Sequence, residues 1–210
     1  MKRNITQQWL VALMMVAALT AGALVACSDD KEEDKPQAKM EALCHVLVSE
    51  DMLKVADVTV HYLDVKGQEA TERMTTTEWK KRWAAASLPA RLSIWVQLTP
   101  KSLKEGELKE TYQLKAVATA TYLFHSAQGG EWIEGWMNVP DPYADPENVA
   151  ADDVQSWCSD DPYVGCKVDA EGNAVPIAVD FGGNKEVKPV YNRFCKWFVG
   201  LWGLGPEYCE

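Results

Sequence analysis

Residues 91–98 read Arg91-Leu92-Ser93-Ile94-Trp95-Val96-Gln97-Leu98, and a proline stands on either side, at Pro89 and Pro100. Apolar residues occupy every second position of this stretch, and successive side chains of a β-strand point to opposite faces. The stretch is therefore predicted to be a strand with one face in a core and the other face toward solvent.

The same alternation recurs along the chain between turn-forming residues. Short segments of this kind, joined by tight turns, are typical of antiparallel sheets. One of them, residues 110–125, exceeds the usual length of a strand, and we expect a bend near Ala118. The other predicted strands are residues 43–48, 56–65, 69–75, 164–168 and 175–181.

Two segments depart from the alternation. Glu78 follows Thr75 at the spacing of a helix capping box, so this segment fits a short helix or a polar edge strand equally well. Near the C-terminus, Pro189 precedes and Gly203 follows an apolar stripe at helical spacing, which predicts one short helix. The stripe consists of Tyr191, Phe194, Cys195, Phe198, Leu201 and Trp202.

Many short strands with few helices predict a mainly β protein. Two antiparallel sheets that each have one apolar face bury those faces against each other, so the expected fold is an antiparallel, immunoglobulin-like β-sandwich. Residues 40–210 are long enough to form one such domain. From about residue 139 the sequence becomes a loop-rich, cysteine-containing C-terminal extension of that domain.

The N-terminal residues have a different composition. Lys2 and Arg3 precede an uncharged run from Trp9 to Ala26, which ends at Cys27. One interpretation of this run is an uncleaved transmembrane helix, because about 18 apolar residues nearly cross a bilayer core. The alanine content and the small residues at its end instead favour a signal peptide over residues 1–26.

The sequence Leu24-Val25-Ala26-Cys27 resembles the lipobox of bacterial lipoproteins, in which the cysteine thiol receives a diacylglycerol and the preceding peptide is removed. The resemblance implies that Cys27 is the lipid-modified first residue of the mature protein and that acyl chains hold it on a membrane. Residues 27–39 have few apolar side chains and are expected to form a disordered acidic tether.

The tether also resembles the export signal of Bacteroidetes-type surface lipoproteins. The residues that carry this resemblance are Ser28, Asp29, Asp30, Lys31, Glu32, Glu33 and Asp34. It implies delivery to the outer membrane and exposure on the cell surface, with the periplasmic face as the alternative. Residues 57–101 loosely resemble small immunoglobulin-like or transthyretin-like lipoproteins of the same bacteria, which supports the fold and implies no activity.

Net charge restricts the possible partners. The chain has 21 Lys and Arg residues and 31 Asp and Glu residues. Removal of residues 1–26 takes away Lys2 and Arg3 and leaves 184 residues with a formal charge of −12. Phosphate groups require a basic surface, so nucleic acid is not expected as a partner.

Five cysteines lie beyond the predicted lipidation site. Disulfides persist outside the cytoplasm, but spacing alone does not decide which cysteines pair. We predict one bridge between Cys158 and Cys166 and another between Cys195 and Cys209, with Cys44 free and buried in a strand. The chain has no Cys-x-x-Cys motif and its histidines are far apart, so we expect no metal and no cofactor.

Four aromatic residues in the region from Gly129 to Gly183, which is rich in Gly, Pro and Asp, are candidate ligand-binding residues. Aromatic faces stack on sugar rings, and the many nearby carboxylates accept hydrogen bonds from hydroxyl groups. The alternative is that these rings pack in the core, as large apolar side chains usually do. The candidates are Trp132, Trp136, Tyr143 and Trp157.

The sequence contains no known catalytic motif, such as Gly-x-Ser-x-Gly, His-Glu-x-x-His or a phosphate-binding loop. We therefore expect a non-catalytic, lipid-anchored binding or accessory module whose ligand is a glycan or another surface protein. A structural subunit of a surface assembly is the second hypothesis, and it requires an open edge strand. A glycan hydrolase is the third, because paired carboxylates are its catalytic groups.

Overall fold

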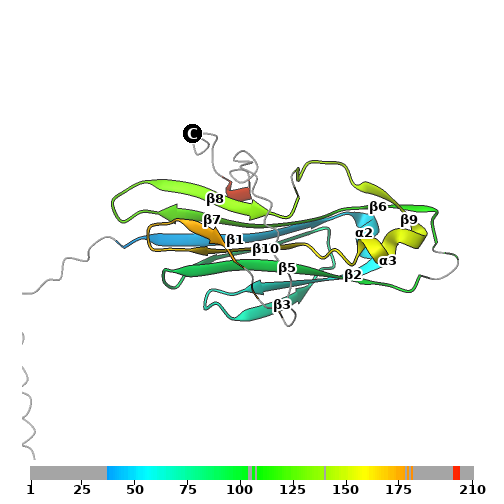
Figure 1. Cartoon of the computed structure of the whole chain (residues 1–210), viewed down its shortest axis with the longest axis horizontal. Coiled ribbons are helices and arrows are strands. Elements are labelled where there is room, and N and C mark those ends of the chain that lie inside the picture. The colour runs from blue at the N-terminus through cyan, green and yellow to red at the C-terminus, as the bar shows by residue number, and fades with distance from the viewer. Residues whose placement is uncertain are drawn as a thin grey trace, which may run out of the picture. The chain divides into compact units, whose positions relative to one another are not determined.

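The computed structural model describes residues 37–103, 106, 108–139, 141–177, 179, 181 and 201–203. They all belong to one of the two compact units into which the chain divides, residues 36–210. The predictions for Cys27, for its export signal and for the pair Cys195 and Cys209 lie outside the described residues. The described part forms two antiparallel sheets that face each other, which confirms the predicted β-sandwich (Figure 1).

The first sheet has four strands in the order β4-β1-β7-β8. These strands are β1 (Lys39–Val48), β4 (Glu78–Ala84), β7 (Ala116–His125) and β8 (Glu131–Met137). The segment that fitted a helix or an edge strand is thus an edge strand, and it pairs with β1 along seven residues. Trp79 and Trp83 share a face in either structure, because four residues bring a side chain back to the same side of a strand as well.

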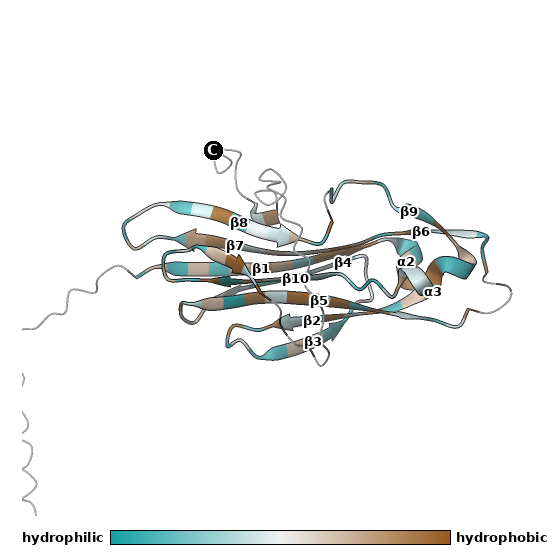
Figure 2. Ribbon diagram, viewed as in Figure 1, coloured by the Kyte–Doolittle hydropathy of each residue, from teal (hydrophilic) through white to brown (hydrophobic). Residues whose placement is uncertain are grey.

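The second sheet has five strands in the order β11-β10-β5-β2-β3. The quoted stretch at residues 91–98 lies at its centre in β5, paired with β2 and β10. Figure 2 shows apolar residues along the strands of both sheets, and the buried ones of the two sheets form one hydrophobic cluster. The strands are β2 (Ala56–Leu63), β3 (Glu69–Arg73), β5 (Ala90–Pro100), β10 (Tyr163–Val168) and β11 (Ala174–Pro176).

A smaller two-stranded sheet and short helices gather at one end of the sandwich (Figure 1). Helix α2 begins after Ser49, whose hydroxyl accepts a hydrogen bond from the Met52 N–H at 3.3 Å and so caps the helix. The Asp51 carboxylate then connects α2 to the small sheet by accepting hydrogen bonds from the Lys109 ammonium and the Gln113 N–H. The elements are α2 (Glu50–Val55), β6 (Thr111–Leu114), β9 (Glu147–Ala150), the 3₁₀ turn η2 (Ala151–Asp153) and α3 (Val154–Trp157).

The long predicted strand at residues 110–125 breaks at Lys115, three residues before the expected bend. The backbone of Lys115 bonds to Ser49 on both sides: its N–H donates to the Ser49 hydroxyl at 3.1 Å, and its carbonyl accepts from the Ser49 N–H at 3.1 Å. Because Lys115 makes these two bonds, β6 and β7 are two separate strands and not one continuous strand. The chain therefore leaves the four-stranded sheet at Lys115 and pairs with β9 instead.

Both faces of β7 are covered. Nine of its ten residues are buried, although successive side chains point to opposite sides of the sheet. On the outer side, Trp202 packs against Leu43 and Leu123 and donates its indole N–H to the Thr121 hydroxyl at 3.1 Å. Residues 201 and 202 are helical, as the predicted C-terminal helix requires, and the rest of that helix lies outside the described residues.

The predicted disulfide between Cys158 and Cys166 is wrong. Both thiols are free and buried, and the third described thiol, Cys44, is also free and buried in β1, as predicted. Cys158 directly follows α3, whereas Cys166 is the fourth residue of strand β10, which begins at Tyr163. Three residues of a strand extend about 10 Å, so Cys166 lies about that far along β10 from Tyr163. Bridged cysteines have Cα atoms within about 7 Å of each other, and the strand leads Cys166 away from α3.

A polar cluster closes one side of the sandwich between the edge strands β3 and β4. The Glu72 carboxylate accepts hydrogen bonds from the Tyr62 hydroxyl at 2.7 Å, the Trp79 indole at 2.8 Å and the Lys81 ammonium at 2.8 Å. These donors, the Lys81 ammonium first, lower the pKa of Glu72 to about 2. Glu72 thereby joins the edges of the two sheets.

Candidate ligand groove

A groove of about 250 Å³ lies where the small sheet, the break at Lys115 and the loop after β8 meet. Its apolar lining residues are Leu114, Ala116, Val117 and Val139, and Trp157 also lines it. Three carboxylates, those of Asp141, Asp145 and Glu147, stand along it and are exposed to solvent. The groove thus combines apolar walls with a few convergent polar groups, the combination found in small-ligand sites.

Lys115 fixes the loop that forms one wall of the groove. Its ammonium donates hydrogen bonds to two backbone carbonyls of the loop, Pro142 O at 2.7 Å and Ala144 O at 2.6 Å. The Asp141 carboxylate stabilises the same turn by accepting the Tyr143 N–H at 2.8 Å. The break between β6 and β7 therefore serves the groove directly, because it places a lysine where it can hold residues 141–144.

Trp157 is positioned by a neighbour in the groove. Its indole N–H donates to Glu147 Oε2 at 2.9 Å, which connects α3 to the first residue of β9. Trp157 is partly buried, because it packs against the main hydrophobic cluster. The remaining surface of the indole lines the groove.

The four predicted binding aromatics do not form one surface. Tyr143 is 65% exposed and lies in the loop of the groove, and Trp157 lines the groove itself. Trp136 is only 3% exposed and packs beside Tyr122, so the prediction that it offers a free face to a ligand is wrong. Segment 131–137 is a strand, and its even-numbered side chains point into the core.

Trp132 also has a packing role. Its ring lies against Phe124 with the ring centroids 4.7 Å apart, and it covers the turn between β10 and β11. A Cβ atom built on Gly172 would come within 2.4 Å of the Trp132 ring, and the φ angle of Gly172 is +86°. Only glycine fits this position without strain. Trp132 therefore closes one end of the sandwich.

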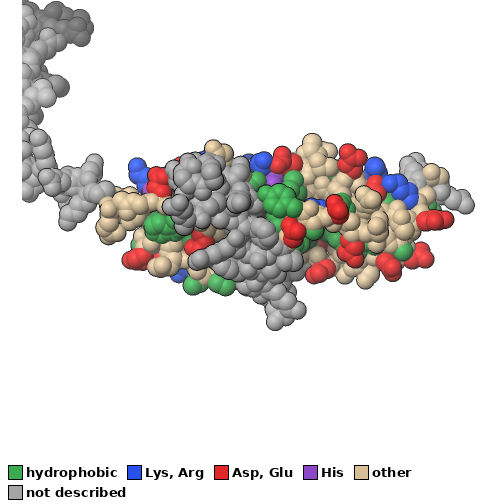
Figure 3. Space-filling view, turned by 90° about the horizontal axis from the view of Figure 1, so that it is seen from above, with side chains coloured by type: hydrophobic (Ala, Val, Ile, Leu, Met, Phe, Trp, Pro, Cys, Tyr) green, Lys and Arg blue, Asp and Glu red, His purple; other side chains and the backbone are tan. Residues whose placement is uncertain are grey.

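Sequence reasoning missed the wall residues Lys115, Asp141, Asp145 and Glu147. The only signal in the sequence was the density of Asp, Pro and Tyr at residues 141–146, which marked a loop but not its neighbours. Figure 3 shows that acidic side chains predominate over basic ones on the half of this face that carries β6 and β9 in Figure 1. The groove therefore lies in an acidic part of the described surface.

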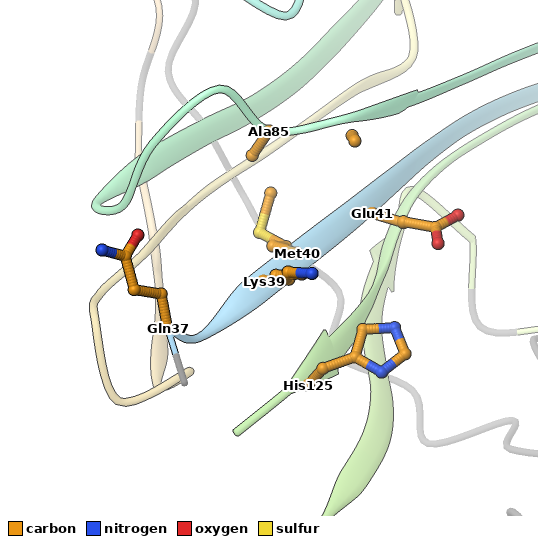
Figure 4. A pocket seen from close by; sticks show the side chains of 7 residues that line it. Gln37, Lys39, Met40, Glu41, Ala85 and His125 are labelled. Carbon is orange, nitrogen blue, oxygen red and sulfur yellow. The ribbon is translucent and has the colours of Figure 1, made fainter. Parts of the chain in front are cut away.

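A second hollow, of about 590 Å³, lies at the start of β1 (Figure 4). In this view Met40 points toward Ala85, and His125 lies away from both. Two ionisable side chains that line the hollow, those of Glu41 and His125, are already paired within the sheet. Glu41 accepts two hydrogen bonds from Arg82, and His125 Nδ1 lies 2.6 Å from Glu131 Oε1. None of the described residues that line this hollow is Trp, Tyr or Phe, so the groove is the stronger candidate.

The described thiols are not arranged for nucleophilic chemistry. Burial raises the pKa of Cys158 to about 11 and raises the pKa values of Cys44 and Cys166 well above their ordinary range. Thiols in this state are protonated at neutral pH and react slowly. Among the described residues, no three His, Cys, Asp or Glu side chains gather closely enough to hold a metal ion.

Comparisons of the chain with protein-family models, with curated proteins and with solved structures found no match. Within the part of the chain that the structure describes, the helices are too short or too polar to cross a bilayer.

Proposed function

We propose that this chain is a lipid-anchored, non-catalytic binding protein of the outer membrane that captures a glycan or protein ligand in the groove beside Trp157. The observation that carries the proposal is the construction of the groove. An indole, apolar walls and three exposed carboxylates converge there, and a lysine holds the loop that frames them. The proposed anchor rests on the lipobox resemblance at Leu24-Val25-Ala26-Cys27.

Two of the edge strands, β4 and β11, are poorly suited to assembly through added strands, which favours binding. A structural subunit that extends its sheets needs an open edge that accepts another strand. Edge strand β4 carries Lys80, Lys81 and Arg82 in succession, and edge strand β11 has only three residues and ends at Pro176. Charges, shortness and proline all discourage pairing between chains.

The carboxylates of the groove also favour binding over glycan hydrolysis. A glycosidase needs one carboxylic acid held in an apolar pocket, so that it stays protonated and can donate its proton to the leaving group. Asp141, Asp145 and Glu147 are all exposed to solvent. Their position suits the acceptance of hydrogen bonds from a ligand.

The test of the proposal uses the full-length protein extracted from its membrane, presented in nanodiscs to arrays of glycans and peptides. Ala144 is an exposed groove residue, and Ala144→Arg fills the groove without removing a core side chain. We expect this variant to lose at least tenfold in affinity for any ligand that the wild type binds. Ala170→Arg, the same substitution in the exposed turn after β10, is the control and should bind like the wild type.

Two results would contradict the proposal. One is that the wild type binds no member of either array, or that Ala144→Arg and Ala170→Arg bind equally well. The other concerns the anchor: the mass of the membrane-extracted protein should correspond to a chain that starts at Cys27 with acyl groups attached. An unmodified thiol at Cys27 with residues 1–26 still present would remove the anchor from the proposal.

A further inference from the structure

We infer that the groove receives an arginine or lysine side chain from a basic segment of a protein partner. This inference rests on the proposed binding function and specifies the chemistry of the ligand. Such a side chain has an apolar stem and a cationic tip. The groove offers apolar walls for the stem, at Leu114, Val117 and Val139, and carboxylates for the tip.

The carboxylates come from three positions of the groove and retain capacity to accept hydrogen bonds. Glu147 Oε2 accepts the Trp157 indole N–H, and Asp141 Oδ1 accepts the Tyr143 N–H. Each carboxylate has about four acceptor positions, so one bond leaves room for a ligand donor on either residue. Asp145 is exposed between them in the sequence and lines the same groove.

The cation already present in the groove does not neutralise these carboxylates by pairing with them. The Lys115 ammonium donates to the carbonyls of Pro142 and Ala144, and among the described residues no ion pair joins it to a carboxylate. Three negative charges therefore face one positive charge in the lining. This balance attracts a second cation and repels an anion.

The indole of Trp157 adds a further preference for a cation. Tryptophan has the most favourable ring face for a cation, and a guanidinium or ammonium within about 6 Å of it is attracted to that face. The bond from the indole N–H to Glu147 holds this ring next to a carboxylate. A planar guanidinium can therefore lie on the ring while its N–H groups reach the carboxylate.

The experiment measures binding of two fluorescein-labelled peptides to the full-length protein in detergent micelles. The peptides share the sequence Ser-Gly-X-Gly-Ser, in which X is arginine or its neutral isostere citrulline. We expect the arginine peptide to bind at least tenfold more tightly than the citrulline peptide. We also expect this difference to shrink as salt is raised from 50 to 500 mM, because salt screens exposed charges.

Matched variants locate the effect. Asp145→Asn removes one carboxylate from the groove, whereas Asp152→Asn removes an equal charge from an exposed site in η2 that does not line the groove. We expect Asp145→Asn to lower the affinity for the arginine peptide at least fivefold. Asp152→Asn should change this affinity less than twofold. Equal effects of the two variants would mean attraction by overall charge, and would overturn a specific site.

The inference fails if the arginine and citrulline peptides bind equally, or if neither binds. In that event, binding to the glycan array described under the proposed function decides whether that function stands. If the wild type binds a glycan and Ala144→Arg does not, the binding function stands, and the ligand of the groove is a sugar and not a basic side chain. Absence of binding to every probe would overturn both.

Discussion

His45 is a buried titratable residue on the outer face of β1. It is 2% exposed, and its Nε2 lies 2.9 Å from Glu78 Oε1 at the start of β4. Burial lowers the pKa of His45 from 6.5 to about 4, although the contact with Glu78 acts in the opposite direction. Desolvation therefore outweighs the attraction of the carboxylate, and the folded protein keeps this imidazole neutral at physiological pH.

The stability of the protein is expected to fall as the pH decreases from 6.5 to 4. In this window the unfolded chain binds a proton at His45 and the folded chain does not, so the free energy of unfolding decreases with acidification. The full effect of such a shift is about 3 kcal/mol. Urea unfolding at pH 7, 5.5 and 4 measures it.

The comparison variant for this prediction is His45→Gln. Its own stability is expected to be lower than that of the wild type, but the slope of stability against pH between 6.5 and 4 should be smaller. Glu78 also contributes to stability, because Lys80 chiefly lowers the pKa of its carboxyl in the folded protein. This contribution is lost only below pH 4.5, the ordinary pKa of the group. An unchanged slope above pH 5 in His45→Gln would contradict the assignment to His45.

Among the elements, the break between β6 and β7 has the clearest consequence. Ser49 caps the start of α2 and also bonds to the backbone groups of Lys115, so one serine begins a helix and interrupts a strand. The interruption frees the Lys115 side chain to reach the loop at residues 141–144. The shape of the groove thus depends on a residue outside its walls.

The variant Lys115→Met tests whether this lysine orders the loop. It keeps an apolar stem of similar length but removes the donor to Pro142 O and Ala144 O. We expect amide hydrogen exchange at residues 141–147 to become at least fivefold faster, with no change in β2 or β5. Lys167→Met, at an exposed position of β10, is the control. Equal exchange in both variants would show that other contacts order the loop.

At the scale of the whole molecule, the strands could be predicted from sequence because alternation is a local property. Residues 56–65, 69–75 and 91–98 predicted β2, β3 and β5 with only small differences at the ends. The small sheet and α2 could not be predicted in this way. Their residues are too few for a periodic pattern, and their positions depend on distant partners such as Ser49 and Lys115.

The groove was only partly predictable for the same reason. Tyr143 and Trp157 were recognised by residue type, but Trp136 was assigned to a loop because glycine and acidic residues surround it. Its partner in the register is Ala120 of the preceding strand β7, and this pairing decides that Trp136 faces the core. The sequence shows which residues are aromatic, and the pairing of strands decides which of them a ligand can reach.

The outer face of the four-stranded sheet is expected to depend on Trp202 for its stability. The ring is 6% exposed, packs on Leu43 and Leu123, and lies 4.3 Å from the Arg82 guanidinium. Trp202→Ala should lower the free energy of unfolding by about 3 kcal/mol and increase binding of a hydrophobic dye to the folded protein.

Trp202→Phe is the matched control, because it keeps an aromatic ring and removes the hydrogen bond to Thr121 with only part of the buried indole. Its loss of stability should be at most half that of the alanine variant. Denaturant unfolding of the three proteins gives both values. Wild-type stability in Trp202→Ala would show that this face does not need the C-terminal residues.

Strand β1 also sets how the protein would respond to mechanical force. It begins at Lys39, next to the N-terminal segment, and it ends beside Ser49, which holds the groove residue Lys115. Its ten residues span about 34 Å. A force applied between Lys39 and the groove would run along this strand and load its pairings with β4 and β7 in shear. In this geometry all backbone hydrogen bonds of β1 bear the load together, and they do not break one after another.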